Sequence, residues 1–263
     1  MYDFNYIQAK NVDEAAQSHG SASDGTYLAG GMTLIPTLKQ RLASPSDLID
    51  LAKIEDLAGI SVKGNSVRIG AMTRHAVVAS SEDVQKAIPA LASLAGGIGD
   101  PMVRNRGTMG GSIANNDPAA DYPSAVVGLG ATVHTSKRNI PGDEFFTGMF
   151  ETALEPGEIV TAVTYPVPDK AAYVKFPNPA SRYAIVGVFV SKTGSAVRVA
   201  VTGAGPCVFR ATEMEKALEA DFSPKAIENI KVSADGLNSD IHATADYRAH
   251  LITVMAKRAV ASM

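Results

Sequence analysis

The stretch that decides the fold is NRGTMGGSIANND, residues 105–117, in which two adjacent glycines lie among small hydroxyl and amide residues. It has neither the alternation of a strand nor the 3.6-residue period of a helix. A second glycine pair occurs in AGGMTL, residues 29–34, after the short apolar run TYL. Glycine is required where a ligand or another segment comes close to the backbone, because a Cβ would occupy that space. Backbone N–H groups exposed in this way bind phosphate oxygens without positive side chains.

Each glycine pair taken singly is also typical of a plain turn, so neither decides the function. Together, with the hydroxyls of Thr33, Thr108 and Ser112, they favour one extended ligand that carries phosphates. Neither stretch has the spacing of a Walker A motif or of GxGxxG, which disfavours a Rossmann fold. The residues alone therefore predict a nucleotide-like cofactor bound without a metal.

Composition narrows the class of protein. The chain has 263 residues, 46% hydrophobic and 19% charged, with a formal net charge of -3. This balance gives no electrostatic reason to expect nucleic acid. Cys207 is the only cysteine, so this chain alone cannot hold a disulfide, a cysteine-rich zinc site or an iron–sulfur cluster. No secretory signal or membrane-spanning run is evident, and the expected compartment is the cytoplasm.

The order of patterns predicts two unequal parts. Asn11 is expected to cap a first helix that stops at Gly20, and Thr33 to cap a helix after the first glycine pair. Residues 82–94 are expected to be helical around Pro89. Three strands (YVKFPNP, YAIVGVFVS and AVRVAVTGAG) and then three helices (ATEMEKALEA, SPKAIENI and the stretch from residue 244) follow, which indicates a separate small α+β lobe from about residue 168.

Long stretches of the chain resemble one known family, the FAD-binding (medium) subunits of molybdenum hydroxylases, which includes the medium subunit of aerobic carbon monoxide dehydrogenase. The resemblance covers essentially the whole chain, and RNRGTMGGSIANNDPAAD is its most specific block. The stretches that carry it are AGGMTLIPTLKQRLASPSDLIDL, IGAMTRH, IGDPMVRNRGTMGGSIANNDPAADYPSAVVGLGA, ALEPGEIVTAV, YVKFPNPASRYAIVGVFV, VAVTGAGPCVFRATEMEKAL and TADYRAHLITVMAKRA.

The resemblance implies an α+β fold. An FAD-binding domain of the vanillyl-alcohol-oxidase (PCMH) type, residues 1–167, would consist of subdomains at about 1–55 and 56–167. A small α+β C-terminal domain, residues 168–263, would hold a three-stranded sheet and helices.

The resemblance also implies which residues bind FAD, and that the binding is non-covalent. The first loop and its flanks are Leu28, Ala29, Gly30, Gly31, Met32, Thr33 and Leu34, and the second loop is Thr108, Met109, Gly110, Gly111 and Ser112. Ile98 and Gly99 would line the adenine end, and Asn115 and Asp121 would make further polar contacts. Lys175 and Tyr183 would lie near the flavin ring. Met32, Thr33, Met109 and Ser112 depart from the residues usual in the family, but no glycine is lost. No residue is assigned to acid–base or nucleophilic catalysis, and no metal site is expected, because flavin chemistry belongs to the cofactor.

The expected role is that of the electron-transfer subunit of an oxidoreductase. FAD would take electrons from the [2Fe–2S] clusters of a small subunit, after oxidation of a substrate at molybdopterin in a large subunit, and pass them to an external acceptor. The expected assembly is a dimer of heterotrimers. Two alternatives stay open: a self-contained FAD-dependent oxidoreductase, and a non-catalytic nucleotide-binding assembly module. The substrate and the acceptor are not readable from this chain.

Overall fold

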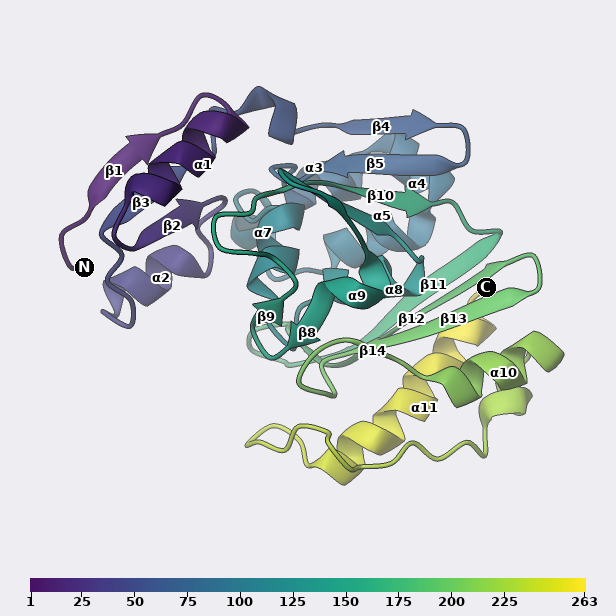
Figure 1. Ribbon diagram of the computed structural model, residues 1–263. Helices are drawn as coiled ribbons and strands as arrows, with labels where there is room; N and C mark the ends of the chain where they lie inside the picture. Colours follow the sequence, from purple (N-terminus) through teal and green to yellow (C-terminus); the bar gives the residue numbers. More distant parts are fainter.

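The computed structural model describes the whole chain, residues 1–263. Its N-terminal part is a three-stranded parallel sheet in the order β1–β3–β2 with two helices, drawn in purple at the left of Figure 1. The elements are β1 (Asn5–Gln8), α1 (Val12–Ser21), β2 (Gly25–Leu28), α2 (Leu34–Lys39) and β3 (Asp47–Asp50). A short 3-10 helix, η1 (Glu55–Leu57), leads out of this part.

The helix ends of this part agree only in part with the prediction. The Asn11 side chain accepts a hydrogen bond from the Glu14 N–H at 2.8 Å, so the predicted cap of α1 is confirmed. The helix continues one residue past Gly20, which is not its stop. Thr33 is the N-cap residue of α2, as predicted, but its backbone is helical in φ and ψ and its side chain makes no capping bond, which leaves its hydroxyl free.

The central part is a five-stranded antiparallel sheet, in the order β4–β5–β10–β6–β7, covered by short helices. Its strands are β4 (Ile60–Lys63), β5 (Ser66–Gly70), β6 (Thr132–Thr135), β7 (Asn139–Pro141) and β10 (Val160–Pro166). Its helices are α3 (His75–Ser80), α4 (Glu82–Ala87), α5 (Pro89–Gly96), α6 (Pro101–Arg104), α7 (Met109–Asn115), α8 (Tyr122–Gly128) and α9 (Gly142–Phe145). The helix expected over residues 82–94 is two helices broken at Ile88, because Pro89 has no N–H to donate and instead starts α5.

A two-stranded hairpin, β8 (Phe146–Gly148) and β9 (Glu151–Thr152), lies beside the end of α7. Asn116 joins the two. It is buried in the left-handed conformation at φ 43°, and its side-chain amide donates to the carbonyls of Gly148 at 2.8 Å and Glu151 at 2.7 Å. The backbone N–H of Phe150 returns a bond to the Asn116 carbonyl at 3.2 Å. One residue thus fixes both the end of α7 and the hairpin.

The C-terminal part has an antiparallel sheet, β11 (Lys170–Pro177), β12 (Ala184–Thr193), β13 (Ala196–Thr202) and β14 (Phe209–Arg210). The three predicted strands are present, and β14 adds a fourth of only two residues. Two of the predicted helices are α10 (Thr212–Ala220) and α11 (Ala245–Ala261). The third, in SPKAIENI, is only the 3-10 turn η2 (Pro224–Ile227).

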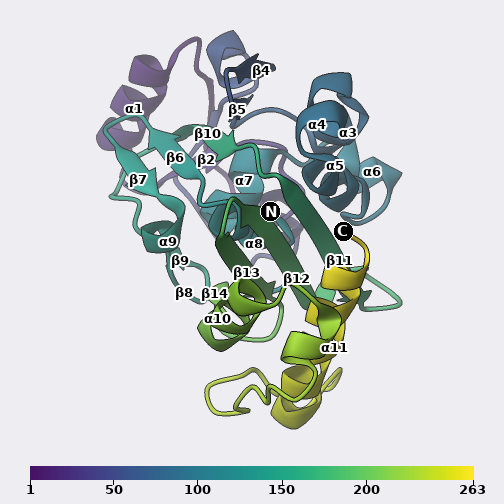
Figure 2. The same ribbon diagram turned by 90° about the vertical axis from the view of Figure 1, so that its right-hand side faces the viewer.

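Strand β12 is buried on both faces. Val186, Val188 and Val190 belong to the core shared with α10 and α11, whereas Phe189 belongs to the core of the central part. Successive side chains of a strand point to opposite faces, so the alternation sends each set to its own layer. Figure 2 shows the sheet between α8 on one side and α10 and α11 on the other. The hydroxyl of Ser191 donates to the Gly128 carbonyl at 2.6 Å and ties β12 to the end of α8.

Candidate cofactor site

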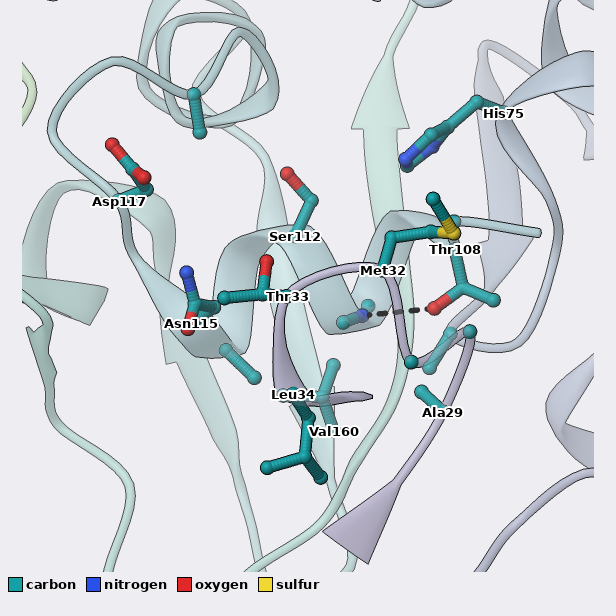
Figure 3. A pocket seen from close by; sticks show the side chains of 18 of the residues that line it. Ala29, Met32, Thr33, Leu34, His75, Thr108, Ser112, Asn115, Asp117 and Val160 are labelled. Atoms are coloured by element: carbon teal, nitrogen blue, oxygen red, sulfur yellow. Dashed lines mark hydrogen bonds between the residues drawn. The ribbon is translucent and has the colours of Figure 1, made fainter. Parts of the chain in front are cut away.

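A pocket of about 550 Å³ lies where the N-terminal part meets the central part, and both glycine-rich stretches line it. Its size is that of pockets which bind small molecules and cofactors. The first loop, residues 29–34, passes across helix α7 in Figure 3. Residues 98–99 of the segment between α5 and α6, and 181–183 before β12, line the pocket as well. The structure therefore brings together segments from three separate regions of the sequence.

The first loop offers unused backbone donors to this pocket. None of the backbone N–H groups from Ala29 to Leu34 donates a hydrogen bond within the chain, although all of these residues line the pocket. The last of these groups lie at the start of α2, where the first N–H groups of a helix have no partner within it and are available to bind phosphate oxygens. Gly30 is needed because its backbone lies against the second stretch. A Cβ there would meet the Arg106 carbonyl and lie 2.8 Å from the Gly107 Cα.

The second stretch is different, because most of its backbone donors are already used, although the Thr108 N–H has no partner in the chain. The N–H of Met109 bonds to the Thr73 carbonyl at 3.0 Å, and that of Gly110 to the Ala71 carbonyl at 2.8 Å. The Gly111 N–H bonds to the capping Thr108 hydroxyl at 3.2 Å. A Cβ on Gly110 would lie 2.8 Å from the Ala71 Cα. The glycine at 110 is thus explained by packing of α7 on the protein, and most of the unpaired N–H groups at the pocket belong to the first loop.

Helix α7 instead presents side chains to the pocket. Ser112 and Asn115 lie one turn apart on it, line the pocket, and make no side-chain hydrogen bond within the chain. Thr33, freed from capping, faces the same pocket from the first loop (Figure 3). A hydroxyl and an amide so placed can each donate and accept hydrogen bonds, which suits the hydroxyls and carbonyls of a sugar or a base.

An ionic network closes one end of the pocket. Asp121 precedes α8 and lines the pocket, with a side chain only 4% exposed. Lys175 on β11 lies 3.0 Å from one of its oxygens and also donates to the Gly97 carbonyl at 2.9 Å, while the Tyr173 hydroxyl donates to the same carboxylate. Burial raises the pKa of Asp121, and Lys175 and then Tyr173 oppose that rise. The charge of Lys175 is therefore largely balanced within the protein.

The residues expected to bind FAD can now be placed. All of them line the pocket except Leu28, Met109 and Lys175. Met109 is fully buried in the central core, Leu28 is the last residue of β2, and Lys175 lies behind Asp121. Their roles toward FAD stay predictions, as do those of the residues that line the pocket.

Several lining residues were not expected from the sequence. The clearest are His75, Asp117 and Arg182. Arg182 has a positive φ of 65° and donates to the Gly99 carbonyl at 3.1 Å, so it joins two lining segments. Burial raises the pKa of Asp117. His75 ends the stretch IGAMTRH, and no pattern in the sequence indicates that its ring enters the pocket.

Comparison with known families agrees with this geometry. Residues 2–168 match the family model described as the FAD binding domain in molybdopterin dehydrogenase. Residues 171–263 match the CO dehydrogenase flavoprotein C-terminal domain. The chain belongs to the FAD-binding medium subunits of molybdenum hydroxylases. The recognition made from the sequence is thereby confirmed, and so is the α+β fold class.

Similar proteins serve enzymes with different substrates. The medium chain of carbon monoxide dehydrogenase from Hydrogenophaga pseudoflava is 35% identical over 98% of this chain and 96% of its own length. The medium subunit of nicotine 6-hydroxylase from Paenarthrobacter nicotinovorans is 32% identical over 97% and 95%. The structure of quinoline 2-oxidoreductase from Pseudomonas putida 86 superposes with a TM-score of 0.89 at 28% identity, over 99% of this chain and 96% of that one.

As a member of this family the medium subunit is the FAD-binding part of a multi-subunit oxidoreductase, with large and small subunits as its partners. The pocket fits FAD on its own evidence, because unpaired N–H groups of the first loop suit a pyrophosphate and free Ser112 and Asn115 suit a sugar or base. No helix in the structure combines the length and the hydropathy that a bilayer crossing requires.

Proposed function

We propose that this medium subunit holds FAD non-covalently in the pocket between the first loop and α7, with the pyrophosphate against the first loop. The observation that carries the proposal is the run of backbone N–H groups from Ala29 to Leu34, which have no acceptor in the chain and line the pocket. A pyrophosphate supplies several oxygens to such donors, and the loop needs no cationic side chain. Ser112 and Asn115 would bind the sugar and base groups that extend along α7.

The flavin ring supplies the redox chemistry when FAD is bound, and the protein positions and tunes it. At the end of the pocket closed by the ionic network, Asp121 presents a buried carboxylate whose charge is offset by Lys175 and Tyr173. Such a network can hold a proton or a charge at a fixed place beside the ring. Tyr183 is 45% exposed at the same pocket and would shield the ring from water on one side.

We further propose that the subunit takes electrons from [2Fe–2S] clusters on its small partner and delivers them to an external acceptor. The clusters must lie on another chain, because cluster ligation needs several thiolates and Cys207 is the only cysteine here. A dimer of heterotrimers is the proposed assembly, which analytical ultracentrifugation of the complex would test. The cytoplasmic location likewise stays a prediction, and cell fractionation would test it.

The first experiment is the absorbance spectrum of the purified subunit, before and after acid precipitation, with mass spectrometry of the released material. Near-stoichiometric FAD in the supernatant supports both the cofactor and its non-covalent attachment. A folded subunit that carries no flavin and takes up no added FAD would contradict the proposal.

A further inference from the structure

His75 is a buried pocket residue that the site described above does not use. It begins α3, its side chain is 4% exposed, and its backbone N–H donates to the Gly107 carbonyl at 3.0 Å. This bond holds the start of α3 against the segment that leads into α7. Figure 3 shows the imidazole directed into the pocket from the side of α3.

Neither ring nitrogen of His75 has a partner in the protein. Nδ1 is sealed from solvent without a hydrogen bond. Nε2 lies against Gly107, only 2.6 Å from where a Cβ on that glycine would stand. Gly107 in turn lies against Gly30, as the 2.8 Å between its Cα and a Cβ on Gly30 shows. The three residues are therefore consecutive neighbours, and Nε2 borders the start of the unpaired N–H run of the first loop.

The surroundings keep this imidazole neutral and favour an anion beside it. Burial, and then the positive charge of Arg104 on α6, lower the pKa of His75 to about 4. Helix α5, which packs on α3, has no titratable side chain, and the charged residues of α4 are exposed. From α8 the ring of Tyr122 approaches, with 5.4 Å between ring centroids. No carboxylate on this side balances the positive charge of Arg104, so a negatively charged ligand in the pocket would balance it.

The position of the proton on the neutral ring follows from burial. A proton on Nδ1 would be a sealed N–H donor without an acceptor, which proteins avoid more strongly than an unused acceptor. Placed on Nε2, the same proton faces the pocket. The imidazole is then a donor next to the unpaired N–H groups of the first loop.

We infer that His75 binds the pyrophosphate of FAD, with Nε2–H donating to a phosphate oxygen beside the N–H groups of Gly30 and its neighbours. This inference rests on the proposed function and assigns a residue that the glycine motifs do not contain. His75 acts as a neutral donor in the free subunit, and its pKa rises when the anion binds. It contributes to affinity for the phosphates and not for the flavin ring.

The test measures dissociation constants of FAD and of ADP for the purified full subunit and two variants. In H75L the donor is lost, and the affinity for both ligands falls about tenfold or more, as for a hydrogen bond to a charged group. In H75Q the side-chain amide reaches the Nε2 position, and affinity stays within about threefold of the unchanged subunit. If H75L does not fold, H75N replaces it, because its amide reaches only the Nδ1 position.

A merely structural role of His75 predicts other results. Then H75Q would lose as much affinity as H75L, or both variants would bind ADP as tightly as the unchanged subunit, and either result overturns the inference. A loss for FAD without a loss for ADP would place His75 at the flavin end and overturn it too. An unchanged subunit that binds neither ligand contradicts the proposed function itself, and the inference with it.

An independent readout is the NMR titration of the His75 ring. Addition of ADP raises its pKa from about 4 by at least one unit, because the bound phosphates favour the protonated form. An unchanged pKa in the presence of saturating ADP would refute the contact. The other histidines in the same spectrum are the control, since none of them lines the pocket.

Discussion

The buried pair of Lys175 and Asp121 makes a sharp prediction about stability. The two side chains are 10% and 4% exposed, and 3.0 Å separates the ammonium from the carboxylate. Lys175→Met keeps the length of the side chain and removes its charge. Asp121 then remains buried with only the Tyr173 hydroxyl as a side-chain donor. Removing one partner of such a buried ion pair lowers the free energy of unfolding by about 3–5 kcal/mol, because the remaining charge is uncompensated.

The cost must depend on pH in a definite direction. Burial already raises the pKa of Asp121, and loss of the opposing Lys175 raises it further. A carboxyl with a raised pKa binds its proton more tightly in the folded than in the unfolded subunit. The penalty is therefore full above the folded pKa and shrinks as the pH falls through it, by up to about 1.4 kcal/mol per pH unit.

Urea unfolding of the FAD-free subunit, followed by circular dichroism at pH 7.5 and pH 5.5, measures both effects. We expect Lys175→Met to lose most at pH 7.5, and the added change Asp121→Asn to restore much of the loss. The amide is uncharged and still accepts a bond from Tyr173. The reasoning is refuted if the double variant is as unstable as Lys175→Met, or if the penalty is equal at the two pH values.

Three further predictions concern single contacts. Gly30→Ala forces the first loop away from the Arg106 carbonyl and should weaken FAD binding at least about tenfold, as measured by fluorescence titration. Gly20→Ala is the control, because a Cβ at Gly20 contacts no other atom, and this variant should bind FAD as the unchanged subunit does. Asn116→Ala removes two buried side-chain donors and the left-handed preference, and should lower the free energy of unfolding by about 2–3 kcal/mol in urea; an unchanged midpoint would mean that the hairpin β8–β9 does not depend on it. Arg248→Met leaves the carbonyls of Ile185 and Gly203 without this buried donor and should cost about 3 kcal/mol, which thermal unfolding would show as a lower midpoint.

Much of the fold follows from local chemistry. The polar side chain of Asn11 marks the start of α1, and the apolar runs of the three long C-terminal strands mark their sheet. The prediction departs from the structure where the local residue pattern is opposed by the backbone conformation or by a proline. Thr33 has the right side chain for a cap, but its backbone is already helical, and Pro89 divides what the apolar pattern suggests is one helix. Strand β14 is too short to leave a pattern at all.

The candidate site is predictable only as far as the glycine stretches and the resemblance go. Whether a loop has free N–H donors depends on acceptors elsewhere in the chain. In the second stretch the Gly110 N–H bonds to the carbonyl of Ala71, which is distant in the sequence. The pairing of Asp121 with Lys175 joins positions in different parts of the fold in the same way. His75 enters the pocket because its backbone N–H holds the start of α3 against Gly107. No local sequence pattern indicates this contact.

The two-faced burial of β12 bears on how this subunit can be divided or recombined. The family models meet between residues 168 and 171, which invites a cut at that point. Such a cut would leave the Phe189 face of the C-terminal sheet open to water and strip α8 of its cover. Either fragment alone should aggregate through that face. A hybrid of two relatives joined at this point should fold only where α8 and the residues of β12 that face α8 come from the same parent.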